Sequence, residues 1–384
     1  MAMAGSFRTS FNDDHHHTVD DAATASKISS SEEEDAAGDE DEDVLLEQYK
    51  QGGLSDTYVW PVHHRATLRH DEFSDMEIPV IDLSCLQTGD PTAMNALVAE
   101  IRAACLEWGF FQVINHGVPL ELISRVQKQA VDFFSLPLEE KSKVAKGPGK
   151  PTGYGFATLS DKKPWSEGFY FADDPSVDDF SRTLWPQGNN PDFADSYREY
   201  DAGVKALALK LMHVVIAGLE VDDTTHFNQY LTKCSALFRW NYYPPCPEPE
   251  KTVGLTAHTD YNLLTVLHQG EIGGLQVEKD GQWIAIRPRE GAFAINVGDT
   301  LQALTNGKYK SVPHRAVVNR SDARISLAYF FAPTKSIPIY PHPELVEAHE
   351  TGAPLYRPFT FEEFTSAKIV QALNTLDQFQ LSLR

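Results

Sequence analysis

The residues that indicate the fold most directly lie between Gly254 and Phe331. This stretch opens with Gly254-Leu255-Thr256-Ala257-His258-Thr259-Asp260, passes through His314 and reaches Arg324-Ile325-Ser326. Successive side chains of a strand alternate between its two faces, so His258 and Asp260 project from one face, and Arg324 and Ser326 likewise share a face. Two ligand-type side chains close in sequence and a distant third can therefore converge on one point.

Two imidazoles and one carboxylate are the ligands of non-haem Fe(II) oxygenases, which leave positions open for a substrate, a co-substrate and dioxygen. Zinc accepts the same ligands. Arg324 and Ser326 favour iron, because a guanidinium fork beside a hydroxyl suits a carboxylate, and hence a metal-chelating dicarboxylate. A lone His-x-Asp is more often structural, but this combination predicts a metal site made by His258, Asp260 and His314.

The pattern around these residues predicts a β-rich core. From Leu237 onward, short β-branched or aromatic runs alternate with turns, and Asp280-Gly281 is a hairpin signal. We expect strands at 274–277, 283–286, 293–297, 311–318 and 325–331. Regularly spaced strands around inward polar ligands indicate a mixed α/β fold, mainly β in its core: a double-stranded β-helix, or jelly roll.

The remainder of the chain predicts the cover of that core. Apolar residues recur at helical spacing over 91–108, in a helix that ends at Phe134, over about 191–219 and over about 361–376. Residues 78–83 and 110–115 are typical of strands, and Pro79 places the first at an edge or a strand start. We expect N-terminal helices and one C-terminal helix to pack on the sheet.

Composition divides the chain and excludes some functions. Residues 1–43 hold thirteen acidic and two basic residues, half of the net charge of -22, and we expect a disordered acidic tail there. The predicted division is completed by a helical N-terminal region at 44–225 and a jelly-roll catalytic core with its C-terminal helix at 226–384. The folded part is also acidic, which disfavours nucleic-acid binding.

Four scattered cysteines form no CxxC pair, which favours a reducing compartment. The most apolar segment is short and interrupted by charge, so we predict no membrane contact and a cytoplasmic or nuclear location. The sequence predicts nothing about the oligomeric state.

Several ordered motifs resemble plant 2-oxoglutarate- and Fe(II)-dependent dioxygenases. The resemblance runs from about residue 55 to the C-terminus and is carried by Asn241-Tyr242-Tyr243-Pro244-Pro245-Cys246, Gly254 to Asp260, Gly273 to Val277, Asn296-Val297-Gly298-Asp299, His314-Arg315, Arg324-Ile325-Ser326 and, upstream, Gly109 to Val113 and Asn115-His116-Gly117. It implies that His258, Asp260 and His314 ligate iron. Arg324, Ser326 and Tyr243 would hold the distal carboxylate of 2-oxoglutarate, with Asn241 near its chelating end and Arg239 adding charge on the same face.

Within that family, Leu264 to Gln269, Gly307 to Ser311 and His314 to Asn319 resemble gibberellin 20-oxidases. The chain departs from that subgroup at Lys163-Pro164-Trp165-Ser166-Glu167-Gly168, where Leu-Pro-Trp-Lys-Glu-Thr is usual, and this departure bears on the substrate. The resemblance implies an oxidase that converts 2-oxoglutarate and dioxygen to succinate and carbon dioxide while oxidising a C-H bond, with ascorbate as reductant. The implied substrate is a diterpenoid carboxylic acid oxidised in successive rounds at one methyl group, C-20.

Other functions remain open at this point. The same chemistry could act on another gibberellin position, as in a 2- or 3-oxidase, or on a flavonoid, an auxin or another specialised metabolite. A different class would be a catalytically silent binding protein that keeps the jelly roll. A zinc hydrolase is disfavoured because the sequence offers no plausible general base beside the metal ligands to activate a water molecule.

Overall fold

The computed structural model describes residues 54–67, 69–147, 152–156, 162–172, 177–370 and 373–382. The predicted tail at 1–43 and the first ten residues of the predicted N-terminal region, 44–53, lie outside these residues. The helices are α2 (Cys85–Thr88), α3 (Pro91–Glu107), α4 (Leu120–Phe134), α5 (Leu138–Ser142), α6 (Val177–Leu184), α7 (Phe193–Ala217), α8 (Thr225–Thr232), α9 (Asp299–Leu304), α10 (Pro343–Glu347), α11 (Phe361–Val370) and the short 3-10 turns η1 (Asp56–Tyr58), η2 (Val62–His64), η3 (Pro249–Lys251) and η4 (Thr375–Phe379).

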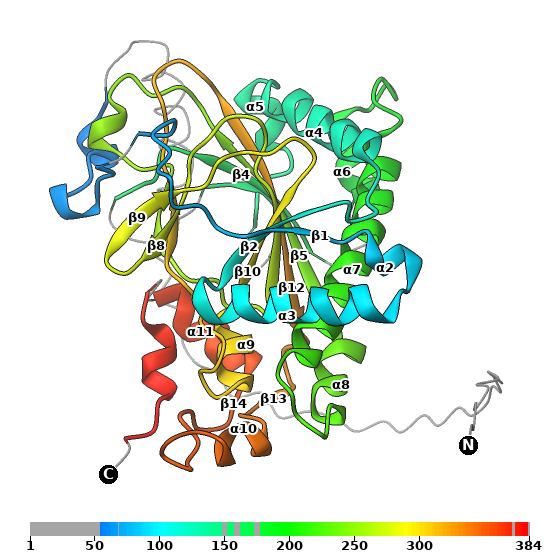
Figure 1. Ribbon diagram of the computed structural model, residues 1–384. Coiled ribbons are helices and arrows are strands. Elements are labelled where there is room, and N and C mark those ends of the chain that lie inside the picture. Colours follow the sequence, from blue (N-terminus) through cyan, green and yellow to red (C-terminus); the bar gives the residue numbers. More distant parts are fainter. Residues whose placement is uncertain are drawn as a thin grey trace, which may run out of the picture.

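The strands form one large, one small and one minimal sheet (Figure 1). The large sheet has the order β1-β2-β10-β7-β12-β5-β4-β3 and the small sheet β6-β11-β8-β9, while β13 pairs with β14. Their bounds are β1 (Val80–Asp82), β2 (Phe110–Ile114), β3 (Gly153–Gly155), β4 (Glu167–Ala172), β5 (Cys234–Tyr243), β6 (Leu255–His258), β7 (Leu264–His268), β8 (Leu275–Lys279), β9 (Gln282–Ala285), β10 (Phe293–Val297), β11 (His314–Ala316), β12 (Arg324–Pro333), β13 (Pro338–Ile339) and β14 (Phe359–Thr360).

The two larger sheets enclose the cavity that the sequence predicts. Strands β5 and β12 are central in the large sheet and pair along their whole length, from Arg324 opposite Tyr243 to Pro333 opposite Cys234. Their side chains alternate strictly: Phe238, Trp240 and Tyr329 are buried in the main hydrophobic cluster, and the residues between them line the cavity. One face of this strand pair therefore belongs to the core and the other to the site.

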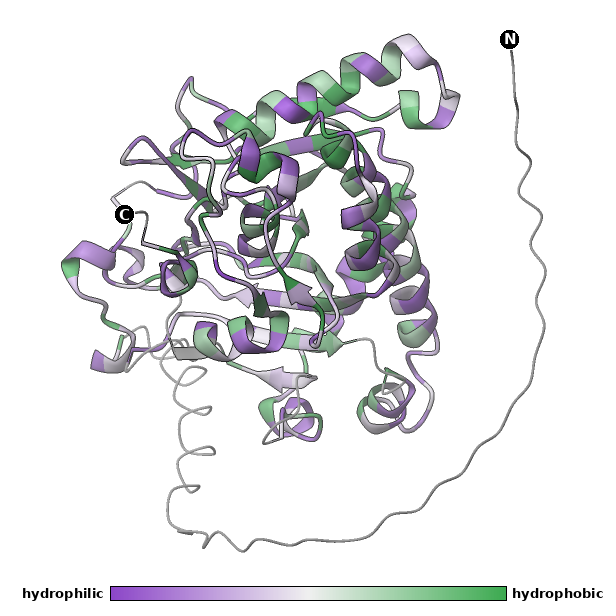
Figure 2. Ribbon diagram, turned by 90° about the horizontal axis from the view of Figure 1, so that it is seen from below, coloured by the Kyte–Doolittle hydropathy of each residue, from purple (hydrophilic) through white to green (hydrophobic). Residues whose placement is uncertain are grey.

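The three longest helices cover the outer face of the large sheet. Helix α7 packs against α3, α4, β7 and β12, and α4 also contacts β12. Each of these helices carries both hydrophobic and hydrophilic residues (Figure 2), as expected of helices that bury only one face. The prediction of N-terminal helices on the sheet is confirmed, although the same region also supplies strands β1 to β4 to that sheet.

Most predicted elements are found close to their expected bounds. The strand with Pro79 before it is indeed at a sheet edge, and Asp280 and Gly281 both have positive φ in the β8–β9 hairpin. Strands β3 and β4 were not predicted from the sequence. The predicted strand at 311–318 is too long, because Pro313 has no N–H to donate and the pairing of β11 with β6 shifts between His314 and Ala316.

The C-terminal helix was predicted too long. Helix α11 ends at Val370, and a separate 3-10 turn follows at Thr375–Phe379, after Asn374 in the left-handed conformation (φ 58°). Helix α11 lies beside α9 at the end of the small sheet (Figure 1). Among the described residues, no helix combines the length and the apolar character that a membrane span requires.

Candidate functional site

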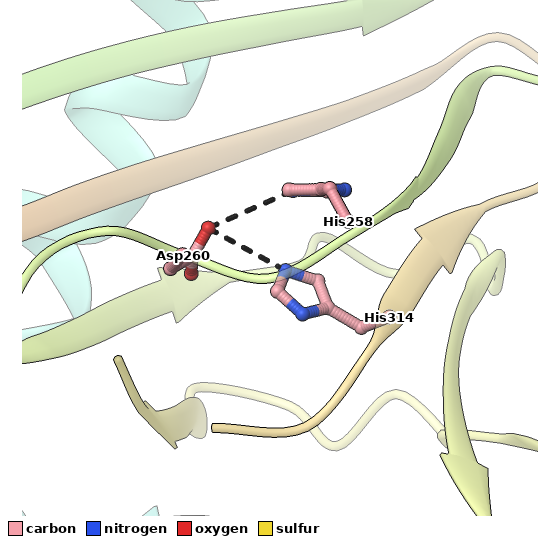
Figure 3. Close-up of side chains that lie close together, drawn as sticks. All are labelled: His258, Asp260 and His314. Atoms are coloured by element: carbon pink, nitrogen blue, oxygen red, sulfur yellow. Dashed lines mark ion pairs between the residues drawn. The ribbon is translucent and has the colours of Figure 1, made fainter. Parts of the chain in front are cut away.

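His258, Asp260 and His314 converge at one end of the small sheet (Figure 3). His258 is the last residue of β6 and lies directly opposite His314, the first residue of β11, in the antiparallel register. Asp260 follows two residues after β6, at the start of the connection to β7. Residues more than fifty positions apart thus become neighbours through strand pairing.

The ligand-type atoms of the three side chains face one another. The Nε2 atoms of His258 and His314 lie 3.6 and 3.7 Å from Oδ1 of Asp260, and one such atom from each residue lies within 4.8 Å of the others. The three side chains are largely buried. These distances suit three ligands on one face of a single cation.

The second nitrogen of each imidazole is engaged away from the centre. Nδ1 of His258 lies 2.8 Å from the carbonyl oxygen of Thr256, and Nδ1 of His314 lies 3.2 Å from that of Val312. A carbonyl accepts only from N–H, so both rings carry their proton on Nδ1 and present Nε2 as a lone-pair donor. Each histidine is oriented by the carbonyl two residues before it.

Asp260 is held in the same manner. Its Oδ2 accepts hydrogen bonds from Thr265 Oγ1 at 2.5 Å and from Asn296 Nδ2 at 2.8 Å, which leaves Oδ1 for the centre. Burial alone would raise the pKa of Asp260, but the two imidazoles and these two hydrogen bonds hold it below its usual value. The carboxylate is therefore ionised at neutral pH.

Burial, and then the neighbouring His314 ring, lower the pKa of His258 to about 3. The His258 imidazole is therefore neutral at physiological pH, which is the form that binds a metal. Neutral nitrogen, ionised oxygen and a fixed orientation of all three side chains fit the residues to a divalent cation such as Fe(II).

The opposite wall of the cavity is the β5–β12 pair. Arg324 lies opposite Tyr243, Ser326 opposite Asn241, and Ala328 opposite Arg239, so the register forms three successive rungs. Asn241 donates from Nδ2 to Ser326 Oγ at 3.3 Å, and the Arg324 guanidinium carbon lies 5.0 Å from the centre of the Tyr243 ring. The predicted shared face is confirmed.

Arg324 is a buried cation that forms no ion pair within the part of the chain that the structure describes. It is 3% exposed, its Nε donates to the carbonyl of Ile272 at 3.2 Å, and its Nη1 has no partner in the described part of the chain. An unpaired buried charge is strongly unfavourable, so this guanidinium is suited to a carboxylate from a ligand. A side chain at Gly254 would come within 2.6 Å of the Tyr243 ring, so glycine there makes room for Tyr243.

The third rung holds a second cationic group. Tyr170 of β4 pairs with Arg239. The guanidinium carbon of Arg239 lies 4.8 Å from the centre of the Tyr170 ring, and Nζ of Lys146 lies 3.9 Å from it. Desolvation of its ammonium group, and then the charge of Arg239, lower the pKa of Lys146. Neither cation forms an ion pair with a carboxylate among the residues that the structure describes.

The seven predicted ligand and co-substrate residues line this one cavity, as does Arg239, which was also predicted to share their face, and the lining further includes Thr265 and Asn296. Sequence reasoning did not assign roles to Thr265 and Asn296, although Asn296 is a polar residue in the otherwise apolar strand Phe293–Val297. It also assigned no role to Lys368 of α11, whose Nζ donates to Thr259 between His258 and Asp260. No sequence motif around Lys368 indicates this contact.

Two family models match the chain. The model of the 2OG-Fe(II) oxygenase superfamily matches residues 234–333, and that of the non-haem dioxygenase in morphine synthesis N-terminal region matches residues 78–188.

The curated relatives and the solved structures agree with these matches. Gibberellin 20 oxidase 2 of Oryza sativa is 37% identical over 85% of this chain and 84% of its own length, and gibberellin 20 oxidase 3 of Arabidopsis thaliana is 35% identical over 88% and 91%. The structure of JOX2 in complex with 2OG, Fe and JA covers 88% of this chain and 97% of its own, with 32% identity and a TM-score of 0.75. That of the dioxygenase for auxin oxidation in rice covers 79% and 100%, with 28% identity and a TM-score of 0.67. The predicted double-stranded β-helix is confirmed.

Proposed function

Because the chain belongs to the 2OG-Fe(II) oxygenase superfamily, we propose that it oxidises a gibberellin precursor at C-20 in successive rounds. It is a dioxygenase that uses Fe(II) and 2-oxoglutarate. The proposed substrate, a diterpenoid carboxylic acid, is supported by the gibberellin 20-oxidase relatives and by the cationic group formed by Arg239, Lys146 and the Tyr170 ring.

We assign the site residues as follows. His258, Asp260 and His314 would hold Fe(II) through two Nε2 atoms and Oδ1. Arg324, with Ser326 and Tyr243, would take the distal carboxylate of 2-oxoglutarate, because this guanidinium is buried and has no anion of its own. Asn241, which bonds Ser326, would lie beside the chelating end of the co-substrate. When bound, iron supplies the activation of dioxygen for attack on a C-H bond.

The protein's own contribution is position and exclusion of water. Thr265 and Asn296 fix the carboxylate of Asp260, and the carbonyls of Thr256 and Val312 fix the two imidazoles. Apolar side chains, including Phe110, Leu267 and Phe330, complete the cavity wall. Such a wall keeps an oxidant away from water and away from polar side chains.

The single observation that carries the substrate proposal is the order of the three rungs. At 3.3 Å per residue, Arg239 lies roughly 13 Å along the strand from Tyr243, on the same face and beyond the co-substrate end. A rigid acid lying between the metal and Arg239 would present a carbon to the metal while its carboxylate meets Arg239 and Lys146.

The test is a panel of candidate substrates. The full-length protein is incubated with Fe(II), 2-oxoglutarate, ascorbate and oxygen and with gibberellin precursors that keep the C-20 methyl, gibberellins that lack it, an auxin and a flavonoid. Mass spectrometry should find stepwise oxidation of the first group only, with one succinate formed per step. Conversion of the auxin, the flavonoid or the gibberellins without C-20, in preference to the precursors, would refute the proposal.

An auxin or another small acid is the second candidate, because a solved relative is a dioxygenase for auxin oxidation and the same cationic group would accept any carboxylate. The same panel separates the two.

The remaining proposals concern organisation. We propose a division near residue 225 between the N-terminal region and the catalytic core, and we propose that residues 1–43 are dispensable for turnover, which a truncated protein would test. A cytoplasmic or nuclear location is proposed because the four cysteines of the sequence are scattered and form no CxxC pair.

A further inference from the structure

A buried ion pair lies directly behind the turn that carries two of the three metal-ligand candidates. Lys368 on α11 donates from Nζ to Asp299 Oδ2 at 2.8 Å and to Thr259 Oγ1 at 2.6 Å. Thr259, the residue between His258 and Asp260, donates in turn to Asp299 Oδ2 at 3.0 Å. The side chains of Lys368 and Asp299 are 9% and 4% exposed.

The backbone of the same turn is held by the start of α9. The carbonyls of residues 260 to 263 accept, in order, from the amide of Asp299, the hydroxyl of Thr300, the amide of Thr300 and the amide of Gly298. A Cβ at residue 298 would lie 2.1 Å from the Asn262 carbonyl oxygen, so the two segments are in direct backbone contact. These bonds begin at Asp260, whereas Thr259 is held through its side chain.

Helix α11 touches the turn on both sides of Asp260. Lys368 reaches Thr259, and the Phe361 ring lies 5.8 Å from the ring of Tyr261. Phe361 and Lys368 are seven residues apart in α11, so they project from one face of the helix, two turns from each other. Helix α11 therefore contacts the residues on both sides of Asp260.

Stability alone does not explain the ion pair. A buried ion pair is often no more stabilising than apolar residues of the same volume, and its best-attested value is to fix a unique arrangement. The arrangement fixed here is the position of Thr259, and with it the separation of His258 and Asp260.

We propose that Lys368 is a positioning residue of the metal site: with Asp299 it ties the C-terminal helix to the ligand turn, so that docking of α11 and the geometry of the metal ligands form one unit. This inference rests on the assignment of His258, Asp260 and His314 as ligands. It does not depend on which substrate the enzyme oxidises.

The experiment measures metal binding by the full-length apoprotein under argon, by titration with Fe(II) and with Mn(II). Lys368→Met keeps the length of the side chain but removes its charge, and it should raise both dissociation constants about tenfold, as loss of a group that orients a metal ligand does. Lys368→Arg should recover most of the affinity. Lys210→Met, at an exposed position of α7, is the matched control and should bind as the wild type does.

Further measurements separate positioning from folding. The KM for 2-oxoglutarate should stay unchanged in Lys368→Met, because the hydrogen bonds of Lys368 within the described part of the chain go to Thr259 and Asp299 and not to the strands that hold Arg324 and Tyr243. Since Lys368→Met leaves Asp299 unpaired in the interior, the double variant Lys368→Met with Asp299→Leu removes both charges and should fold. It should still bind metal weakly.

A lower melting temperature with an unchanged metal dissociation constant, in the single variant or the double variant, would overturn the inference. The site assignment fails in a different way: it is refuted if Asp260→Ala binds metal as tightly as the wild type.

Discussion

The two ends of the cavity differ in how they are built, although both lie on strands β5 and β12. At the co-substrate end, Arg324 is buried and its neighbours Tyr243, Ser326 and Asn241 all come from the paired strands. At the other end, Arg239 is partly exposed and its companions, Lys146 and Tyr170, come from a loop and a third strand. In the proposed assignment, binding of the co-substrate thus depends on strand register, and selection of the substrate depends on a loop and a third strand, which can vary independently.

The largest expected effect comes from a change at the proposed metal centre, on which both ends of the cavity depend. Asp260→Ala deletes the only acidic member of the triad and should abolish turnover and weaken Fe(II) binding, because the two imidazoles alone form an incomplete ligand set. Metal titration and succinate release measure the two effects. Normal turnover of purified Asp260→Ala protein would show that the metal is held elsewhere.

A change at the co-substrate end should act on one ligand only. Arg324→Leu removes two charge-assisted hydrogen bonds to a carboxylate, about 3 kcal/mol, and should raise the KM for 2-oxoglutarate by about two orders of magnitude. Arg239→Leu is the control with the same charge change, and it should leave that KM unaltered. Equal effects of the two variants on 2-oxoglutarate would remove the distinction between the ends.

A change at the substrate end should depend on the charge of the substrate. Arg239→Met should lower kcat/KM for a gibberellin acid about tenfold, because a partly exposed ion pair contributes about 1 kcal/mol or slightly more. The methyl ester of the same compound lacks the charge that Arg239 would bind, so it should be a poor substrate of the wild type and should be converted equally by both proteins. If acid and ester lose activity to the same degree, Arg239 does not bind the carboxylate.

The smallest effect is expected beside the metal. Thr265→Val removes one of two hydrogen bonds to Asp260 Oδ2 and keeps the shape of the side chain, so Fe(II) affinity should fall about fivefold. Asn296 still orients the carboxylate in that variant. Combining Thr265→Val with Asn296→Leu should exceed the sum of the single effects, and strictly additive losses would mean that the two donors act separately.

Most of the site residues identified from the sequence have relative positions that follow from strand geometry, whereas Asp260 lies beyond the end of β6. Alternation alone put Arg324 beside Ser326 on β12, and Arg239 beside Asn241 and Tyr243 on the same cavity-facing side of β5. Thr265 and Asn296 were missed in their role because a hydrogen bond to Asp260 leaves no periodic trace. The end of the C-terminal helix was missed because the left-handed Asn374 interrupts a pattern that remains apolar beyond it.

The reaction type could be predicted from the sequence, because the ligand-type side chains, the guanidinium and their order along the chain are visible there, and strand periodicity assigns them to faces. Which faces meet follows only from the folded chain. Strand pairing set His314 opposite His258 and Arg324 opposite Tyr243, and helix docking brought Lys368 of α11 to Thr259, more than a hundred residues away. Such contacts depend on packing across the chain, which short-range periodicity does not encode.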